Sequence, residues 1–134
     1  MRRVPVACSI YVSFREQACS GAFLDHVAQC IAPRVKIAVL AHIRHAIAEP
    51  FGGGMEAHCD MLCRGLRAAG HEVDLFAAEG SHDENLVPIC AAPYDEVLPW
   101  RVYRGTSELA AYQRAAFERV LLKIGGGGYD VVHN

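Results

Sequence analysis

Three consecutive glycines, Gly52, Gly53 and Gly54, stand directly before an amphipathic helix pattern, with Glu56 two residues further on. The first turn of a helix has free N–H groups and a partial positive charge. Glycines at this place let a phosphate approach the backbone closely. The triplet therefore predicts a phosphate-binding loop, although a plain turn into a helix would use the same residues. The helix dipole alone would also explain an acid at position 56.

Three histidines stand where apolar runs end. His133 closes the last run, and His42 and His45 follow the first. In open parallel sheets, ligands bind outside the carboxyl ends of the strands, so all three positions could face a ligand. Solvation is the alternative for each loop histidine. Cys59 and Cys63 share one face of the predicted helix, but too few other ligands accompany them for a metal site, and we predict none.

The candidate residues can be positioned in this way only if a strand, a helix and a second strand follow one another along the chain. Residues 35–42 form a short aliphatic run, typical of a strand buried on both faces of a parallel sheet. Residues 54–69 have helical periodicity and end at Gly70, which can adopt the left-handed conformation that stops a helix. Residues 71–78 form the next strand. Together they predict a right-handed βαβ unit.

The rest of the chain predicts a loop over residues 79–88, a short strand near 96–98 and a helix over 107–124. Glycines 125–128 end this helix, and residues 129–134 begin another strand. The fold class expected is α/β, a partial Rossmann-like parallel sheet with flanking helices.

Helical spacing predicts which residues face the core. The first helix should bury Met55, Cys59, Leu62 and Leu66, with Asp60, Arg64 and Arg67 on its other side. The second should bury Leu109, Tyr112, Ala116, Phe117, Val120, Leu121 and Ile124, and Thr106 or Ser107 can cap it.

Residues 1–34 have no clear period and are expected to be an unassigned, poorly ordered extension or to contain a helix across residues 23–31. Their start resembles a signal peptide weakly, without a clean cleavage site. The domain expected to carry function is therefore residues 35–134. We find no linker or internal repeat within it.

Composition excludes several function classes. The 134 residues carry a formal net charge of −2, so no basic field favours nucleic acid. No apolar run is long enough for a transmembrane helix. The six cysteines form no CxxC pair, which favours free thiols and a cytoplasmic location.

The glycine loop does not match the dinucleotide fingerprint. That motif follows its strand directly, whereas about ten residues intervene here. The lysine of the Walker motif is also missing. Glu79, after the second strand, stands where a dinucleotide fold has its ribose-binding acid, but we interpret Glu79 as a solvated loop carboxylate. A dinucleotide-dependent oxidoreductase is disfavoured, while a non-enzymatic nucleotide- or phosphate-binding module stays open as an alternative.

The order of four pieces resembles a known family: "VKIAVLAH", "FGGGMEAHCDMLCRGLRAAG", "HEVDLFAA" and "YDVVHN". Over residues 35–134 the chain is similar to the amino-terminal domain of a family 4 glycosyltransferase of GT-B fold. The resemblance implies sugar transfer from a nucleotide diphosphate sugar to an acceptor, without a further cofactor. It implies that Gly52, Gly53 and Gly54 approach the donor diphosphate, that Glu56 is the motif acid, and that His133 is the catalytic candidate.

The resemblance also sets limits. The donor-binding domain that such an enzyme requires is not in this sequence, so we expect a fragment that is inactive alone. An unfinished sheet would leave an open edge, which invites self-association.

Overall fold

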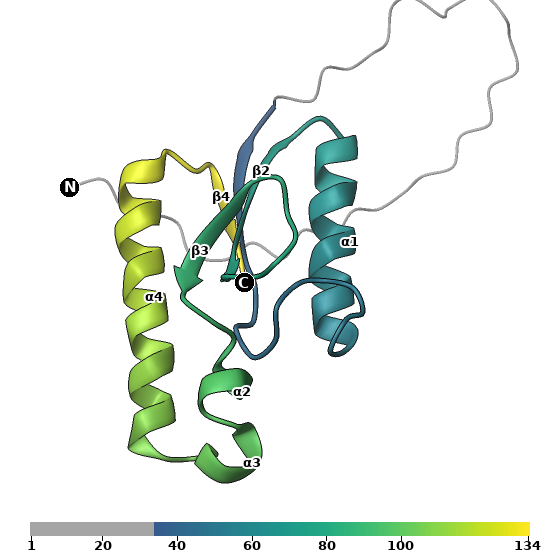
Figure 1. Cartoon of the computed structure of the whole chain (residues 1–134). Coiled ribbons are helices and arrows are strands. Elements are labelled where there is room, and N and C mark those ends of the chain that lie inside the picture. The colour runs from purple at the N-terminus through teal and green to yellow at the C-terminus, as the bar shows by residue number, and fades with distance from the viewer. Residues whose placement is uncertain (1–33) are drawn as a thin grey trace, which may run out of the picture. The chain divides into compact units, whose positions relative to one another are not determined.

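Residues 34–134, which the computed structural model describes, form a parallel four-stranded sheet with helices on both faces (Figure 1). The strands are β1 (Lys36–Leu40), β2 (Glu72–Ala78), β3 (Leu86–Cys90) and β4 (Val131–His133). The helices are α1 (Gly54–Ala68), α2 (Tyr94–Val97), α3 (Trp100–Tyr103) and α4 (Ser107–Gly127). This confirms the expected α/β class. The helix predicted across residues 23–31 lies outside the described residues.

The strand order is β3-β2-β1-β4, and every neighbouring pair is parallel. The chain moves outward from β1 through β2 to β3 and then returns to the other side of β1 with β4. In the register, Val39 of β1 lies beside Leu75 of β2 on one side and beside His133 of β4 on the other. The order of connection therefore reverses between β1 and β4, the position called the topological switch point.

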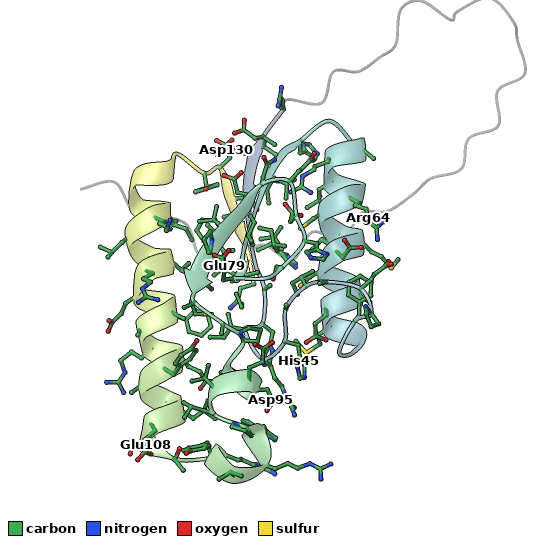
Figure 2. The ribbon with its side chains drawn as sticks, viewed as in Figure 1. His45, Arg64, Glu79, Asp95, Glu108 and Asp130 are labelled. Carbon is green, nitrogen blue, oxygen red and sulfur yellow. The ribbon has the colours of Figure 1, made fainter. Side chains whose placement is uncertain are left out.

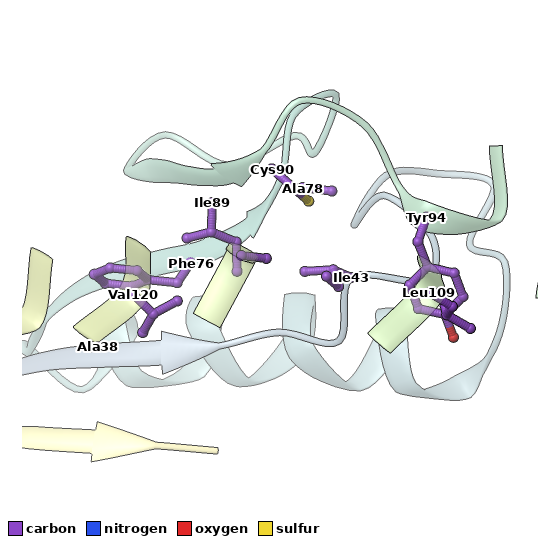
Figure 3. Packing of buried hydrophobic residues seen from close by; sticks show 10 residues of the cluster. Ala38, Ile43, Phe76, Ala78, Ile89, Cys90, Tyr94, Leu109 and Val120 are labelled. Atoms are coloured by element: carbon purple, nitrogen blue, oxygen red, sulfur yellow. The ribbon is translucent and has the colours of Figure 1, made fainter. Parts of the chain in front are cut away.

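Two apolar layers hold the helices against the sheet. Alternate strand residues point to opposite faces, so Val39 and Leu75 pack toward α1 while Ala38 and Phe76 pack toward α4. The α1 layer consists of Ile37, Val39, Ala41, Ile47, Cys63, Val73, Leu75 and Ala77. Figure 3 shows the α4 layer, which contains Ala38, Ile43, Phe76, Ala78, Ile89, Cys90, Tyr94, Leu109, Ala116 and Val120.

Helix α1 follows its predicted span, and Gly70 ends it with a φ of +92°. Cys59, Leu62 and Leu66 face the core as predicted. Met55 does not, because its side chain is 63% exposed and Glu56 takes the inward position of the first turn.

Arg67, predicted on the outer side of α1, instead packs toward β2. Its guanidinium donates two hydrogen bonds to Asp83, at 2.7 and 2.9 Å, and one to the carbonyl of Val73 at 2.8 Å. Arg67 lies on nearly the same face of α1 as buried Cys63, because the two residues are about one helical turn apart. A charge on the core side is stable here because a carboxylate and a carbonyl satisfy it.

Helix α4 is capped by Thr106, whose hydroxyl accepts from the N–H of Leu109 at 3.4 Å. The helix does not stop at residue 124 as predicted, but continues through three glycines to Gly127. Gly128, with a φ of +63°, ends it in the left-handed conformation. Phe117 and Leu121 were predicted in the core but are 41% and 72% exposed, because they lie to one side of the buried stripe.

Two other predictions were wrong. Part of the expected loop over residues 79–88 is β3, which lies at the edge of the sheet, where its exposed Pro88 is tolerated. The expected strand near residues 96–98 is helix α2 with the turn after it. There Asp95 accepts a hydrogen bond from the N–H of Trp100 at 2.5 Å, linking α2 to α3.

A polar cluster fixes the start of β4 at the amino edge of the sheet. The Tyr129 hydroxyl donates to Asp74 of β2 at 2.6 Å, and Asp130 accepts from the N–H of Lys36 at 2.8 Å. The N–H of Asp130 in turn bonds the carbonyl of Lys36 at 2.9 Å. These contacts set the β1–β4 register before the short strand begins.

Candidate functional site

The predicted site residues lie at the carboxyl edge of the sheet or on the loop that leaves it. The loop of residues 41–53 leaves β1 at this edge and leads to the first turn of α1. His133 is the last residue of neighbouring β4 and is exposed. Because β1 and β4 flank the switch point, their carboxyl ends border the crevice where such sheets bind ligands.

The three glycines meet different surroundings. A Cβ at Gly52 would lie 2.8 Å from Cγ of His45, so this glycine is needed for the imidazole to rest on the loop. A Cβ at Gly53 would lie 3.1 Å from Oε2 of Glu56. At Gly54 a Cβ would meet nothing within 4 Å. The backbone at the start of α1 is therefore closed on one side by His45 and open at Gly54.

No side chain caps α1, since Gly53 is its N-cap residue. The carbonyl of Gly53 accepts the N–H of Ala57 at 3.3 Å, which leaves the N–H groups of Gly54, Met55 and Glu56 outside the helix ladder. Such a terminus can hold an anion.

Glu56 is 4% exposed, although the prediction required only an acid near the helix dipole. It is one of two buried polar or charged residues in the described chain, the other being Ser81. Ser81 has a structural partner, because its hydroxyl accepts the N–H of Ile47 at 2.9 Å.

His42 has a fixed orientation. Its Nδ1 accepts the N–H of Arg44 at 3.1 Å, and its ring meets that of Tyr94 edge-on at a centroid distance of 5.8 Å. Burial lowers the pKa of His42 below its ordinary 6.5, while the nearby carboxylate of Glu56 opposes this effect. The neutral ring, with Nδ1 as acceptor, carries its proton on Nε2 and offers a hydrogen-bond donor.

Asp95 of α2 ties the loop after β1 to the helices that follow β3. Its Oδ2 lies 3.5 Å from Nε of Arg44 and 3.9 Å from Nε2 of His45 (Figure 2). The hydrogen bond from Trp100, and then Arg44 and His45, lower the pKa of Asp95. The N–H of Tyr94 also bonds the carbonyl of Ile43 at 3.0 Å. The loop that positions His42 and His45 is thus held from α2.

Sequence reasoning missed Arg44, Tyr94 and Asp95, which hold this loop. The only local signal was an aspartate shortly after Pro93, a combination typical of a helix start or turn. Their contacts join segments far apart in the chain, so no periodicity could reveal them.

The other candidates have structural explanations. Glu79 is exposed, as expected of a solvated carboxylate. Asp83 binds Arg67. Cys63 is buried and Cys59 half-buried against the sheet, and both are free thiols. Within residues 34–134 no cluster of three potential metal ligands occurs.

A separate hollow of about 300 Å³ lies beside the glycine loop and contains none of the predicted site residues. It is lined by Ile47, Ala48, Glu49, Phe51, Asp60, Arg64 and His82. The Asp60–Arg64 ion pair lies in its wall.

Comparison with known proteins gives one family. A family model described as Glycosyltransferase Family 4 matches residues 52–134, from the glycine loop to the end of β4. No curated protein matches the chain. In the part of the chain that the structure describes, no helix is both long and apolar enough to span a bilayer.

Proposed function

The chain belongs to glycosyltransferase family 4, and we propose that it supplies the glycine-loop side of a site that transfers a sugar from a nucleotide diphosphate sugar to an acceptor. The observation that carries this proposal is the open backbone at Gly54, next to Gly53. It lies at the N-terminus of a 15-residue helix beside the switch point of the sheet. A departing diphosphate develops negative charge, and free N–H groups at a helix N-terminus stabilise such charge.

The residues of the site have distinct roles in this proposal. Gly52, Gly53 and Gly54 let the diphosphate approach, and Glu56 belongs to the same loop. His133 faces the reacting sugar or acceptor from the end of β4. Its exposure at the carboxyl edge supports contact with a ligand.

The proposal includes a second, donor-binding domain, as in a GT-B enzyme, with the active site between the two domains. Residues 35–134 form the amino-terminal domain and residues 1–34 an extension. Without the donor domain, we expect no sugar transfer by the 134-residue chain. The location proposed is the cytoplasm, in keeping with the free thiols of Cys59, Cys63 and Cys90.

Self-association through the open edge of β4 is a further part of the proposal. β4 pairs with β1 on one side only, and its Val132 is 47% exposed. An unpaired strand edge of this kind can pair with a second chain. Sedimentation of the chain over a range of concentrations tests this, and a monomer at every concentration would reject it.

Two matched alanine variants test the diphosphate loop. Gly54→Ala and Gly65→Ala each place a methyl group in open space on α1, but only the first is at the N-terminus. We expect uridine diphosphate to shift the amide NMR signals of residues 52–54, with weaker binding to Gly54→Ala and unchanged binding to Gly65→Ala. Equal binding by all three proteins, or sugar transfer by the chain alone, would contradict the proposal.

A non-enzymatic nucleotide- or phosphate-binding module is the second candidate, because the complete glycine loop lies within one sheet-and-helix unit. Calorimetric titration with nucleoside diphosphates separates the two. A self-sufficient module should bind at micromolar concentration, whereas half of a two-domain site should bind at millimolar concentration or weaker.

A further inference from the structure

The glycine loop is reached through residues 48–52, which have few restraints of their own. Among the residues that the structure describes, no backbone hydrogen bond joins residues 48–52 to another segment. The part of the loop before them is better fixed. The carbonyl of Ile43 accepts the N–H of Tyr94 at 3.0 Å, and the N–H of Ile47 donates to a serine hydroxyl at 2.9 Å. The placement of the glycines therefore depends on side chains that contact them.

The ring of His45 connects the fixed part of the loop to the glycines. It packs against Gly52, where a Cβ would lie only 2.8 Å from Cγ and 2.9 Å from Cδ2 of the imidazole. Phe51 packs beside it against the apolar layer of α1. Segments with few contacts and few hydrogen bonds open locally, so the imidazole limits the motion of Gly52 and of the helix start that follows it.

Asp95 holds this ring from outside the loop. Its Oδ2 lies 3.9 Å from Nε2 of His45 and 3.5 Å from Nε of Arg44 (Figure 2). Its Oδ1 accepts the N–H of Trp100 at 2.5 Å, which fixes the carboxylate itself. The guanidinium of Arg44 is restrained further, because its Cζ lies 5.4 Å from the centroid of the Trp100 ring. One carboxylate on α2 thus restrains two neighbouring side chains of the loop.

We propose that Asp95 is a positioning residue for the glycine loop and acts through the His45 ring on Gly52. The inference rests on the proposed function, in which this loop binds the donor diphosphate, and Asp95 does not touch the ligand. A backbone already held in its binding conformation loses less conformational entropy when the anion binds. Asp95 should therefore increase the affinity for an anion, although a carboxylate would weaken it by charge alone.

Asp95→Asn tests the sign of this effect in the full 134-residue chain. The amide oxygen can still accept the N–H of Trp100, but the negative charge that faces Arg44 and His45 is lost. By charge alone, the substitution should strengthen the binding of inorganic pyrophosphate. By loss of positioning, it should weaken this binding. We expect about threefold to tenfold weaker binding, measured from the amide NMR signals of residues 52–54.

Glu96→Gln is the matched control, because Glu96 is the neighbouring carboxylate on α2 and is exposed. It should bind pyrophosphate as tightly as the original chain or slightly more tightly. The His45 ring signals of the free protein should move in Asp95→Asn and not in this control.

His45→Ala shows whether the effect passes through the imidazole, and it tests the proposal independently if Asp95→Asn does not fold. This variant should also bind pyrophosphate more weakly. Adding Asp95→Asn to it should cause little further loss, because the two residues then act as one unit. If the two losses add, Asp95 acts by another route and the proposal is wrong.

The outcomes separate this proposal from the proposed function. If pyrophosphate shifts the amides of residues 52–54 in the original chain, but Asp95→Asn binds it equally or more tightly, the positioning role is wrong and the diphosphate loop stands. If His45→Ala binds pyrophosphate as tightly as the original chain, the positioning role is also wrong. If pyrophosphate shifts none of these amides in the original chain, both proposals are overturned.

Discussion

Replacing Gly52 by alanine should destabilise the protein because the imidazole of His45 occupies the space of the new methyl group. The added Cβ would lie 2.8 Å from Cγ, 2.9 Å from Cδ2 and 3.1 Å from Cβ of His45. Ordinary contacts between such atoms begin at 3.4 Å, so the two groups must separate by at least about 0.6 Å. The atoms involved are near the base of the side chain, and a change of rotamer alone cannot relieve them all.

The expected cost of Gly52→Ala is about 1–3 kcal/mol of unfolding free energy, the usual range for overpacking. The separation would also move the His45 ring away from Asp95. Its Nε2 now lies 3.9 Å from Oδ2 of Asp95. Urea denaturation measures the loss, and the His45 ring signals in NMR should change with it.

Gly65→Ala is the control for this measurement. Gly65 is inside α1 and a Cβ there meets nothing within 4 Å, so alanine should stabilise the chain by about 0.5–1 kcal/mol through its higher helix propensity. The two substitutions should therefore have opposite signs. A Gly52→Ala variant as stable as the original chain, with unchanged His45 signals, would refute the contact between the loop and the imidazole.

Three other predictions follow from single contacts. Tyr129→Phe removes the 2.6 Å hydrogen bond to Asp74 and should cost about 1–2 kcal/mol, with faster hydrogen exchange of the β4 amides; unchanged exchange would show that other contacts hold the strand. Burial raises the pKa of the Cys63 thiol to about 11, so alkylation at pH 8 should be much slower there than at half-buried Cys59 in the native chain, and similar rates would contradict this. Burial lowers the pKa of His42, so the unfolded state binds more protons than the folded state below pH 6.5, and the free energy of unfolding should fall as the pH is lowered from 6.5 toward the folded pKa. Urea titrations from pH 5 to 7.5 should show a smaller change of this free energy with pH for His42→Gln. An equal change would exclude His42 as the cause.

The regular helices and strands at the start of the fold could be predicted from the sequence. The aliphatic run of β1, the periodicity of α1 and the glycine at position 70 predicted a βαβ unit that the structure confirms. The placement of His133 at the carboxyl edge followed from parallel topology alone. These features depend on local patterns that a single sequence displays.

The parts that were wrong depend on position in the sheet. The polar character of residues 79–88 predicted a loop, yet β3 begins at Leu86 and lies at an edge of the sheet, where the missing N–H of Pro88 is tolerated. Phe117 and Leu121 fit a helical apolar face, but they lie to one side of the stripe that α4 buries. Similarly, the burial of Glu56 could not be predicted, because only the folded loop shows how the glycines place it.

The polar cluster at the amino edge, built around Tyr129 and Asp130, has a consequence for engineering. It fixes β4 against β1 at the end of the sheet opposite to His45 and Asp95 (Figure 2). We therefore expect substitutions in the loops at the carboxyl edge to leave the strand register intact. We expect a library that varies positions 42 and 133 together to keep this scaffold unchanged.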